Sequence, residues 1–433
     1  MNWDATEVGL DDETRFETLN GLWTGKKPPF VTAGVIRNTN FTESGRIDYS
    51  DVAWLQVEQK QLAKRLLKPG DTIVERSGGG PKQPVGRVVY FGRDDGAFSF
   101  SNFTSAIRIR DAHEFDAKFV FYRLLELYQS GRTEDIQRRT TGIRNLDFTA
   151  YKQRATFPQI PVPEQRKIAG VLAVLQGAAE QQERLLALTA ELKKALRHRL
   201  FTAGLRNEPK RQTDIGPLPK SWDSTPLGTC CDIVSGSMSY TDFLKAPISE
   251  DSDSVTCMAV KVSDMNLPGN EDRFITANAI KSLPLALAAR KLIPARTLIF
   301  PKRGAAIATN KKRVTTTWTV LDPNLIGVRC KAGLDPQFLY HWSQTFDLRK
   351  ITDPGPTPQL NKKDLVPVQM PVPREIEEQR EIARILDLAD QKFNLHRRRH
   401  ATLNALFRTL LHQLMTAQIR IRDIVIPELD STQ

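Results

Sequence analysis

The stretch Pro161-Val162-Pro163-Glu164-Gln165-Arg166-Lys167-Ile168-Ala169 occurs twice in this 433-residue chain. Its second copy is Pro371-Val372-Pro373 followed, after an insertion at 374–377, by Glu378-Gln379-Arg380-Glu381-Ile382-Ala383. The copies start 210 residues apart (161 to 371) and then match at a spacing of 214 (165 to 379). A repeat of this length far exceeds one solenoid unit, so it indicates duplication of a whole domain together with its helix.

Both copies are expected to begin long amphipathic helices near their Glu-Gln-Arg triplets, because proline is tolerated in a first helical turn. In the second helix, the residues of one face recur in alternating steps of four and three. They are Ile382, Leu386, Ala389, Phe393, His396, His400, Leu403, Phe407, Leu410 and Leu414. This spacing is typical of a coiled-coil seam.

The first helix carries a poorer version of the same stripe. Its matched positions include three polar residues, Gln182, Thr189 and Lys193. Three leucines beside the stripe are expected to widen the apolar face: Leu185, Leu188 and Leu192. An ordinary globular core is the alternative for any single helix, but two matched helices of about 40 residues, roughly 60 Å each, exceed the usual length several-fold. Because a folded domain lies between them, antiparallel pairing of the two helices is predicted.

The other segments indicate a mixed α/β domain before each helix. In the first domain, β-rich runs lie at 30–36 and 71–75 and a helical pattern at 115–129; in the second, strands are expected at 255–262, 297–300 and 325–330. The predicted fold class is α/β (mixed α+β): two globular α/β domains separated by two long α-helices packed as an antiparallel coiled coil. The predicted limits are 1–157 and 207–366 for the domains, 158–206 and 367–420 for the helices, and 421–433 for a tail.

Three shorter segments also carry expectations. Residues 49–67 suggest a charged surface helix, and residues 207–213 a short polar, basic linker. The proline-rich segment 353–363 is expected to form a stiff, exposed loop without regular structure.

The composition favours a polyanionic partner. The formal net charge is +12, and strongly basic chains most often bind nucleic acid, although a merely basic soluble protein is the alternative. The acidic N-terminal stretch has no apolar core of a secretory signal, and no segment is long enough to span a membrane. The four cysteines, never spaced as C-x-x-C, suit a reducing compartment. A cytoplasmic location without a membrane partner is therefore expected.

Donor-bearing turns in both domains are the candidate DNA-binding segments. Glycine allows close approach of the backbone to a ligand, and Arg, Lys and Asn can donate to phosphates and base edges. The candidates of the first domain are Lys26, Lys27, Arg37, Asn38, Asn40, Arg76, Lys82, Arg138, Arg139 and Arg144. Those of the second are Lys302, Arg303, Lys311, Lys312, Arg313, Thr315, Lys362 and Lys363. Solvated surface loops are the alternative for any one of them.

Catalytic patterns are weak in this sequence. Residues 21–26 resemble a phosphate-binding loop but are one residue short, and Lys27 stands where a magnesium-binding hydroxyl is needed. Asp51 with Glu58 and Lys60 resembles a nuclease motif only at a spacing common by chance. His396 and His400 could bind a metal as an i, i+4 pair, but polar layers that set helix register are the simpler interpretation. No catalytic residue, cofactor or metal ligand is assigned to this chain.

The paired Pro-x-Pro and Glu-Gln-x-x-Ile-Ala helices, each after a variable domain, resemble the specificity (S) subunit of type I restriction-modification systems. Lys68 to Val74 with Gly86-Arg87, Ile215 to Trp222, and Gly355 to Asn361 are similar to further segments of that family. The first domain departs from the family pattern by lacking a Pro-x-x-Trp opening. The second has Pro294-Ala295-Arg296-Thr297 where Gly-Asp is expected.

The resemblance implies a specific function. Two target recognition domains would each bind one half of a bipartite, asymmetric site on double-stranded DNA, and the helices would fix their separation. The helices would also dock two methyltransferase (modification) subunits, with Gln165, Arg166, Gln379 and Arg380 as candidate contacts. S-adenosylmethionine, ATP and magnesium would belong to the methyltransferase and to motor-nuclease (restriction) subunits, and the chain itself would perform no chemistry.

Two other classes of function stay open on the sequence alone. One is a self-contained DNA-modifying enzyme with a divergent site, and the other is a coiled-coil scaffold without DNA affinity. Under the DNA-binding hypothesis, removing the charges of Lys311, Lys312 and Arg313 should weaken binding to all sequences and reduce its salt dependence.

Overall fold

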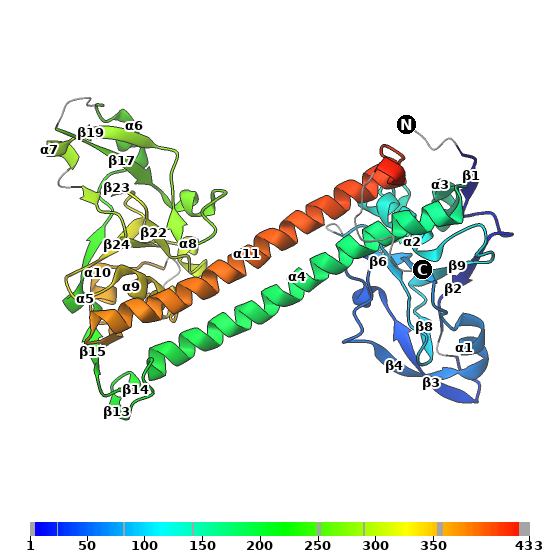
Figure 1. Ribbon diagram of the computed structural model, residues 1–433, viewed down its shortest axis with the longest axis horizontal. Helices are drawn as coiled ribbons and strands as arrows, with labels where there is room; N and C mark the ends of the chain where they lie inside the picture. Colours follow the sequence, from blue (N-terminus) through cyan, green and yellow to red (C-terminus); the bar gives the residue numbers. More distant parts are fainter. Residues whose placement is uncertain are drawn as a thin grey trace. The chain divides into compact units, whose positions relative to one another are not determined.

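The computed structural model describes residues 5–23, 25–80, 83–140, 143–248, 253–288, 291–352 and 358–423 (Figure 1). The chain divides into two compact units. Unit 1 comprises Met1–Arg184 and Arg397–Gln433, and unit 2 comprises Leu185–His396. The division falls inside the two long helices, so each unit contains about half of each helix. The domain limits expected from the sequence stay predictions.

Unit 1 is built on two β-sheets. The first has the order β2 (Phe16–Asn20), β9 (Thr104–Ile109), β5 (Thr72–Glu75), β7 (Val88–Tyr90), with all neighbours antiparallel. In the second, β3 (Phe30–Ile36) lies between an antiparallel β4 (Ala53–Glu58) and a parallel β8 (Phe98–Phe100). The remaining elements are β1 (Glu7–Gly9), η1 (Asn38–Asn40), α1 (Gln59–Arg65), β6 (Ser77–Gly79), α2 (Ala117–Gln129), β10 (Gln137–Thr140), β11 (Ile143–Leu146), α3 (Phe148–Arg154), β12 (Thr156–Pro158) and η4 (Ile421–Asp423).

Alternating residues of the first sheet divide the core of unit 1. Val74, Val88 and Ile107 pack with α2 and the long helices, while Ile73 and Val89 pack toward the second sheet. This alternation is the period of two that a strand buried on both faces requires. The first sheet is therefore the central layer of the unit.

Unit 2 repeats this architecture. Its larger sheet has the order β16 (Cys231–Ser235), β24 (Leu325–Cys330), β21 (Leu298–Pro301), β22 (Arg313–Thr315), β18 (Phe274–Ile275), and its smaller sheet β19 (Ile280–Pro284), β17 (Ser254–Val260), β23 (Thr319–Leu321), β20 (Leu292–Ile293). The other elements are β13 (Lys210–Thr213), β14 (Gly216–Pro219), β15 (Trp222–Pro226), α5 (Leu227–Cys230), α6 (Tyr240–Lys245), η2 (Val262–Asn266), α7 (Leu285–Ala288), α8 (Ala305–Ala308), α9 (Pro336–Ser343), η3 (Leu348–Ile351), α10 (Lys362–Leu365) and β25 (Gln369–Pro373).

The strand pairing shows that the two units have the same sheet topology. Strand β17 pairs antiparallel with β19 and parallel with β23, as β3 pairs antiparallel with β4 and parallel with β8. The order β16-β24-β21-β22 corresponds to β2-β9-β5-β7. The duplication indicated by the repeated helix stretch thus includes the α/β part of each unit, and the predicted mixed α/β fold class is confirmed.

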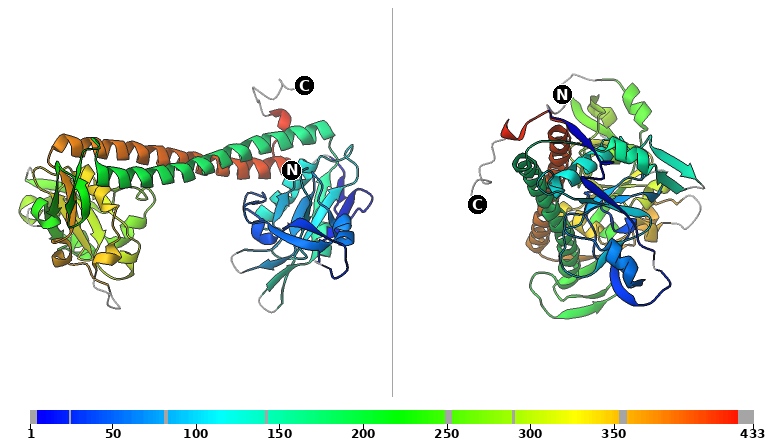
Figure 2. Two further views of the ribbon diagram at one scale, coloured as in Figure 1. Left: turned by 90° about the horizontal axis from the view of Figure 1, so that it is seen from below. Right: turned by 90° about the vertical axis from the view of Figure 1, so that its right-hand side faces the viewer.

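The long helices are α4 (Val162–Ala203) and α11 (Ile376–Met415), and they pack on each other (Figures 1 and 2). In unit 1, Leu172 of α4 shares a core with Phe407 and Leu411 of α11. In unit 2, Leu200 near the end of α4 shares a core with Leu386 near the start of α11. Within each unit, the first half of one helix therefore meets the second half of the other, which is the predicted antiparallel arrangement.

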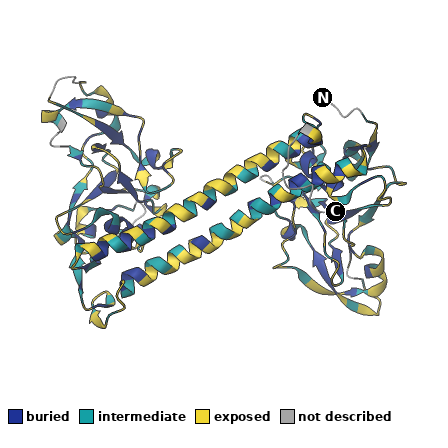
Figure 3. Cartoon of the chain, viewed as in Figure 1, coloured by how far each residue is buried: buried dark blue, intermediate teal, exposed yellow. Residues whose placement is uncertain are grey.

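Burial along these helices follows the predicted seam with one exception. Every seam position from Ile382 to Leu414 is buried or half-buried, and so are the matched positions of α4 (Figure 3). However, Leu188 is 62% exposed and Leu192 is 51% exposed, so the prediction that they widen the buried face is wrong. The two leucines lie beside the seam and face solvent. None of the described helices is apolar over a sufficient length to cross a membrane.

Two segment predictions also need correction. Residues 49–67 do not form one surface helix: strand β4 comes first, and α1 follows at Gln59. The segment 207–213 is not only a linker, because its second half is β13, paired with β14. In the proline-rich segment, residues 353–357 lie outside the described residues, and Lys362 and Lys363 begin the short helix α10.

The second Pro-Val-Pro is the end of strand β25, whereas the first runs into α4. The insertion at 374–377 accounts for this difference. Arg374 donates from Nε and Nη2 to the two carboxylate oxygens of Asp223, both at 2.9 Å, and Glu375 forms an ion pair with Arg206. The inserted residues therefore connect the start of α11 with β15 and with the end of α4.

Candidate DNA interface

In each unit, four chain segments meet at one edge of the central sheet, which we call the loop edge. In unit 1 it consists of residues 21–23, 76–79, 101–103 and 143–146, and in unit 2 of residues 236–238, 302–304, 322–324 and 358–361. The edge lies where β5 ends and β9 begins, since Glu75 pairs with Thr104, and where β21 ends and β24 begins, since Pro301 pairs with Leu325.

The same backbone hydrogen bonds join these segments in both units. Arg76 N donates to Phe103 O at 2.8 Å, and Leu146 N donates to Arg76 O at 2.8 Å. In unit 2, Lys302 N donates to Asn324 O at 2.7 Å, and Leu360 N donates to Lys302 O at 2.9 Å. The bonds establish that Arg76 corresponds to Lys302, and Leu146 to Leu360.

A glycine permits close packing at the same place in both loop edges. A Cβ on Gly21 would lie 1.9 Å from Ser101 O, and a Cβ on Gly236 would lie 1.9 Å from Asp322 O. Both distances are far below any tolerable contact, so a side chain at either position would force the segments apart. The scaffold of the loop edge is therefore equivalent in the two units and is determined by backbone contacts.

The side chains carried by this common scaffold differ. In unit 1, Ser77 pairs with Asn145, and the Ser77 hydroxyl donates to Asn145 Oδ1 at 2.5 Å. In unit 2, the exposed Arg303 pairs with Gln359. Unit 1 also presents Trp23, which is 68% exposed, in the first segment of its loop edge. The two edges consequently offer different hydrogen-bonding groups from the same backbone positions.

The structure brings together predicted segments that are far apart in sequence. The turn after Arg76 and the segment 138–145, both predicted as donor-bearing loops, form one three-stranded sheet in the order β10-β11-β6. The predicted segment starting at Lys302 likewise pairs with Gln359. Parts of the segments predicted as loops are therefore strands, because the backbone groups of one segment form hydrogen bonds with those of its partner segment.

Several candidate side chains are accessible to a ligand. Lys26, Lys27, Arg303, Lys362 and Lys363 are exposed. Arg138 is exposed too, although its guanidinium pairs with the Asp147 carboxylate. These residues stay predictions as DNA contacts. For Arg139 only the backbone is placed, in β10, and Lys82 lies outside the described residues.

Other candidates are half-buried and make internal hydrogen bonds. They are Arg37, which donates to Asp51 O at 3.1 Å; Asn38, to Ser77 O at 3.3 Å; Arg76, to Asn20 Oδ1 at 2.9 Å; Arg144, to Gln137 Oε1 at 3.5 Å; and Lys311, to Asn266 Oδ1. Arg76 also lies over the Phe148 ring at 4.6 Å, and burial lowers its pKa. These side chains shape the loop edges, and a contact with DNA would have to compete with those bonds.

Four candidates are buried, and the prediction that they contact DNA is wrong for them. Asn40 is 1% exposed and donates to Asp48 O and Asp51 O, which closes the turn after β3. Thr315 is 1% exposed, donates to Pro294 O at 2.9 Å and accepts from Thr297 N at 3.1 Å. Both side chains satisfy backbone groups in the interior.

Lys312 and Arg313 are the other two buried candidates. Lys312 is 2% exposed, donates from Nζ to Phe346 O at 2.6 Å and lies 4.7 Å from the Phe346 ring centre. Burial lowers the pKa of Lys312 to about 8. Arg313 donates from Nε to Asn270 O at 2.7 Å, and burial lowers its pKa as well. Two residues of this dense basic run therefore lie in the interior of unit 2 and donate to backbone carbonyls there.

The candidate partner contacts divide into buried and exposed residues. Gln165 donates to Glu114 O and Ile160 O, both at 2.8 Å, and accepts from Asp116 N at 2.8 Å. In the same way, Gln379 donates to Gly333 O at 3.0 Å and to Pro373 O at 2.9 Å, and it accepts from Asp335 N at 2.9 Å. Both glutamines are 0% exposed, so the prediction that they bind a partner subunit is wrong.

These two glutamines have an internal function that the sequence did not indicate. Asp116 and Asp335 are the N-caps of α2 and α9, and each accepts from a backbone amide of its own helix. Each glutamine therefore fixes the start of a long helix to the start of a domain helix. Arg166 and Arg380 are exposed beside them, with side-chain exposures of 66% and 58%, and stay candidates.

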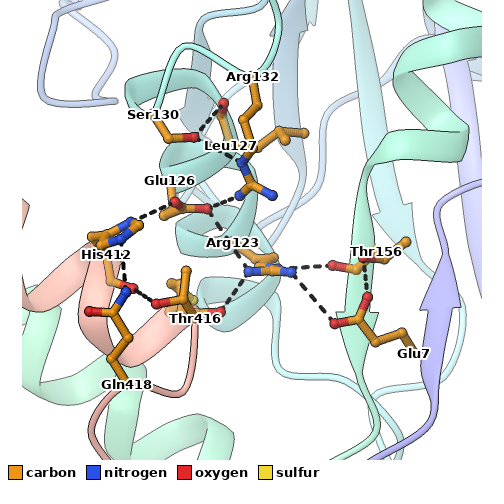
Figure 4. A network of polar contacts seen from close by, with 11 residues as sticks. Glu7, Arg123, Glu126, Leu127, Ser130, Arg132, Thr156, His412, Thr416 and Gln418 are labelled. Carbon is orange, nitrogen blue, oxygen red and sulfur yellow. Dashed lines mark hydrogen bonds and ion pairs between the residues drawn. The ribbon is translucent and has the colours of Figure 1, made fainter. Parts of the chain in front are cut away.

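A polar network in unit 1 was also missed by the sequence interpretation (Figure 4). Glu126 of α2 is 2% exposed, pairs with Arg132, and accepts from His412 Nδ1 of α11 at 3.1 Å. Arg123 donates to Met415 O at 2.6 Å and to Thr156 O at 2.9 Å. The network attaches the end of α11 to α2. Only the helical pattern at 115–129 pointed to this region.

The structure also bears on possible metal sites. His396 is 7% exposed, and the ring nitrogen Nε2 of His400 lies 3.0 Å from Asn404 Nδ2. Among the residues that the structure describes, no group of three or more His, Cys, Asp or Glu side chains is arranged to hold a metal ion.

Comparison with known proteins gives consistent matches. Residues 275–405 match the family model described as the type I restriction modification DNA specificity domain. The type I restriction enzyme MjaVIII specificity subunit of Methanocaldococcus jannaschii is 21% identical over 325 residues, covering 71% of this chain and 72% of the relative. The putative MjaX specificity subunit of the same organism is 21% identical over 445 residues, covering 97% of both chains.

A solved structure shares the fold of the whole chain. The crystal structure of the type I restriction-modification system S subunit from M. genitalium covers 96% of this chain and 97% of its own, with a TM-score of 0.59 and 17% identity. The duplicated α/β units, each with half of the two long helices, define the architecture that this chain shares with that structure. The chain is similar to type I restriction-modification specificity subunits, and the resemblance found in the sequence is confirmed. Recognition of DNA sequence is the property that this family carries.

Proposed function

We propose that the chain reads a bipartite, asymmetric DNA site, one half with each unit. The observation that carries this proposal is the loop edge, because one backbone scaffold occurs twice with different side chains. Two identical edges would read two identical half-sites, whereas Ser77 with Asn145 and Arg303 with Gln359 present different donors and acceptors. An asymmetric target follows from that difference.

Charge supports DNA as the ligand. The net charge is +12, and exposed lysines occur in both units, at Lys26 and Lys27 in unit 1 and at Lys362 and Lys363 in unit 2. Lysines of this kind attract the phosphate backbone without reading its sequence, and base contacts then select the site. The exposed lysines would therefore supply affinity, and the loop edges specificity.

The long helices would serve as the spacer between the half-sites. Equivalent positions on B-DNA recur about every 34 Å of helical turn, so a protein that reads two half-sites must hold its readers at a defined phase. Helices α4 and α11 each extend without interruption through residues of both units. A continuous helix transmits a defined spacing better than a flexible linker would.

Chemistry would come from partner subunits. Two methyltransferase subunits would bring S-adenosylmethionine and modify adenine, and motor-nuclease subunits would use ATP and magnesium for restriction. The chain would direct them to the site and perform no chemistry itself. Arg166 and Arg380, exposed at equivalent positions near the two helix starts, are candidate contacts for two copies of one methyltransferase.

A selection experiment tests this function. The full chain, alone and with the methyltransferase subunit, would be mixed with a random duplex library, and the bound DNA sequenced. We expect one asymmetric motif with two defined halves separated by a fixed number of undefined base pairs. Modification or cleavage of DNA by the isolated chain would contradict the non-catalytic assignment, and binding without any motif would indicate a scaffold.

A further inference from the structure

Arg303 is an exposed cation of the unit 2 loop edge, and the residues on both sides of it are held by backbone hydrogen bonds. The backbone is fixed on both sides of Arg303: Lys302 N donates to Asn324 O at 2.7 Å, Leu360 N donates to Lys302 O at 2.9 Å, and Gly304 N donates to Pro358 O at 2.9 Å. A side chain on a backbone that hydrogen bonds hold in place varies less in direction than one on a loop without such bonds.

The neighbours of Arg303 determine which way it faces. Lys302 Nζ lies 3.4 Å from Ser235 Oγ, so the Lys302 side chain extends along the sheet toward β16. Successive residues of an extended segment point to opposite sides, and Arg303 is exposed. Gly304 follows with φ 65° and ψ −158°, a conformation that favours glycine, and turns the chain away. The Arg303 guanidinium therefore projects from the edge into solvent.

Its cross-strand partner adds a second recognition group. Arg303 pairs with Gln359, whose Nε2 donates to Asn361 Oδ1 at 3.1 Å. That hydrogen bond restricts the orientation of the Gln359 side-chain amide. The equivalent positions of unit 1 hold Ser77 and Asn145, which follows from the matching bonds Leu146 N to Arg76 O and Leu360 N to Lys302 O.

We propose that these two cross-strand pairs, Arg303 with Gln359 and Ser77 with Asn145, set which bases each unit reads, and that Arg303 recognises a guanine. This inference rests on the proposed DNA-reading function. A guanidinium donates two parallel hydrogen bonds to the O6 and N7 atoms of guanine in the major groove. The side chains of Ser77 and Asn145 are shorter and uncharged, so unit 1 would select other bases with the same scaffold.

The test compares the motifs selected by wild type and by variants of the full chain, alone and with the methyltransferase subunit, from a random duplex library. Arg303→Ala should remove the preference for one G·C pair in one half-site, by roughly 10- to 100-fold, and leave the other half unchanged. The double variant Arg303→Ser with Gln359→Asn, which copies the pair of unit 1, should replace the preference at the same position. Melting temperatures of all variants verify folding.

Lys220→Ala is the matched control, because it removes one exposed positive charge of unit 2 from the segment after β14. If Arg303 only contacts phosphate, Arg303→Ala lowers affinity for every sequence by one factor and leaves the motif intact, which would overturn the inference while the proposed function stands. If wild type itself selects no motif, the proposed function fails instead.

Discussion

Arg87 and Glu75 form a two-point ion pair in the interior of unit 1, with Nε to Oε2 and Nη2 to Oε1 both at 2.8 Å. Glu75 is 0% exposed and Arg87 9% exposed. Arg87 also donates to Asn38 O at 3.0 Å and to Phe41 O at 3.2 Å, so the pair holds the turn after β3 against the end of β5. One of the four segments of the unit 1 loop edge begins at Arg76, the residue after Glu75.

Replacing one member of this pair should strongly destabilise unit 1. We expect Glu75→Gln to lower the free energy of unfolding by about 3–5 kcal/mol, because it leaves the buried Arg87 charge uncompensated. Urea unfolding followed by circular dichroism measures the change. Asp95→Asn, at the exposed pair with Arg93, is the control and should change little. Equal, small effects of both substitutions would contradict a structural function of the buried pair.

The glutamines at the helix starts should be more important for stability than for partner binding. Gln379→Ala removes three hydrogen bonds of a buried side chain, with Gly333 O, Pro373 O and Asp335 N, and should cost about 2–4 kcal/mol. Hydrogen exchange should show reduced protection at the starts of α9 and α11. Arg380→Ala, one residue away and exposed, is the comparison. A stable Gln379→Ala protein that fails to bind the methyltransferase would restore the original interpretation.

Lys312 should make stability depend on pH. Burial lowers its pKa from 10.5 to about 8 in the folded protein, so between pH 8 and 10.5 the unfolded chain binds more protons than the folded one. Stability contributed at this position therefore rises with pH across that window. Relative to a Lys312→Met variant, wild type should gain on the order of 1–3 kcal/mol from pH 8 to 10.5.

The measurement is urea unfolding of both proteins at several pH values. If the free energies of unfolding of the two proteins changed in parallel with pH, the Lys312 amine would not be desolvated in the folded protein, and the structure would be contradicted. The same variant should leave the salt dependence of DNA binding unchanged, in contrast to the sequence-based expectation, because the amine is bonded to Phe346 O in the interior.

The exposed lysines should control the salt dependence of DNA binding instead. Replacing Lys26 and Lys27 with alanine should weaken binding to specific and unrelated duplexes by a similar factor. The slope of log K against log salt should become shallower by about 1 for each phosphate that the protein no longer neutralises. Fluorescence anisotropy at several salt concentrations measures both. Replacement of Lys362 and Lys363 is the corresponding experiment in unit 2, and an unchanged slope in either pair would exclude that pair from the interface.

The sequence predicted the elements whose patterns are local. Strands at 30–36 and 325–330 were found with the same limits, because β-branched runs bounded by turn residues show a strand directly. The two long helices began within two residues of their Glu-Gln-Arg triplets, at Val162 and Ile376, because a sustained heptad stripe is a strong signal.

The functional surface was harder to predict because it depends on distant backbone partners. The basic run 311–313 suggested an exposed patch, but Lys312 and Arg313 find carbonyl acceptors at Phe346 and Asn270 and are buried. The correspondence between Ser77 and Arg303 is carried by hydrogen bonds between segments with no similar residues. No periodicity in the sequence reveals either relation.

The most direct test of the account is the motif selected when each loop edge is changed separately. The wild-type chain with its methyltransferase subunit, Asn145→Ala in unit 1, and Arg303→Ala in unit 2 would each be used to select from one random duplex library. We predict that each substitution alters one half of a bipartite motif, a different half for each, with an unchanged spacer. Substitutions that alter both halves together, or neither, would contradict the division of recognition between the two units.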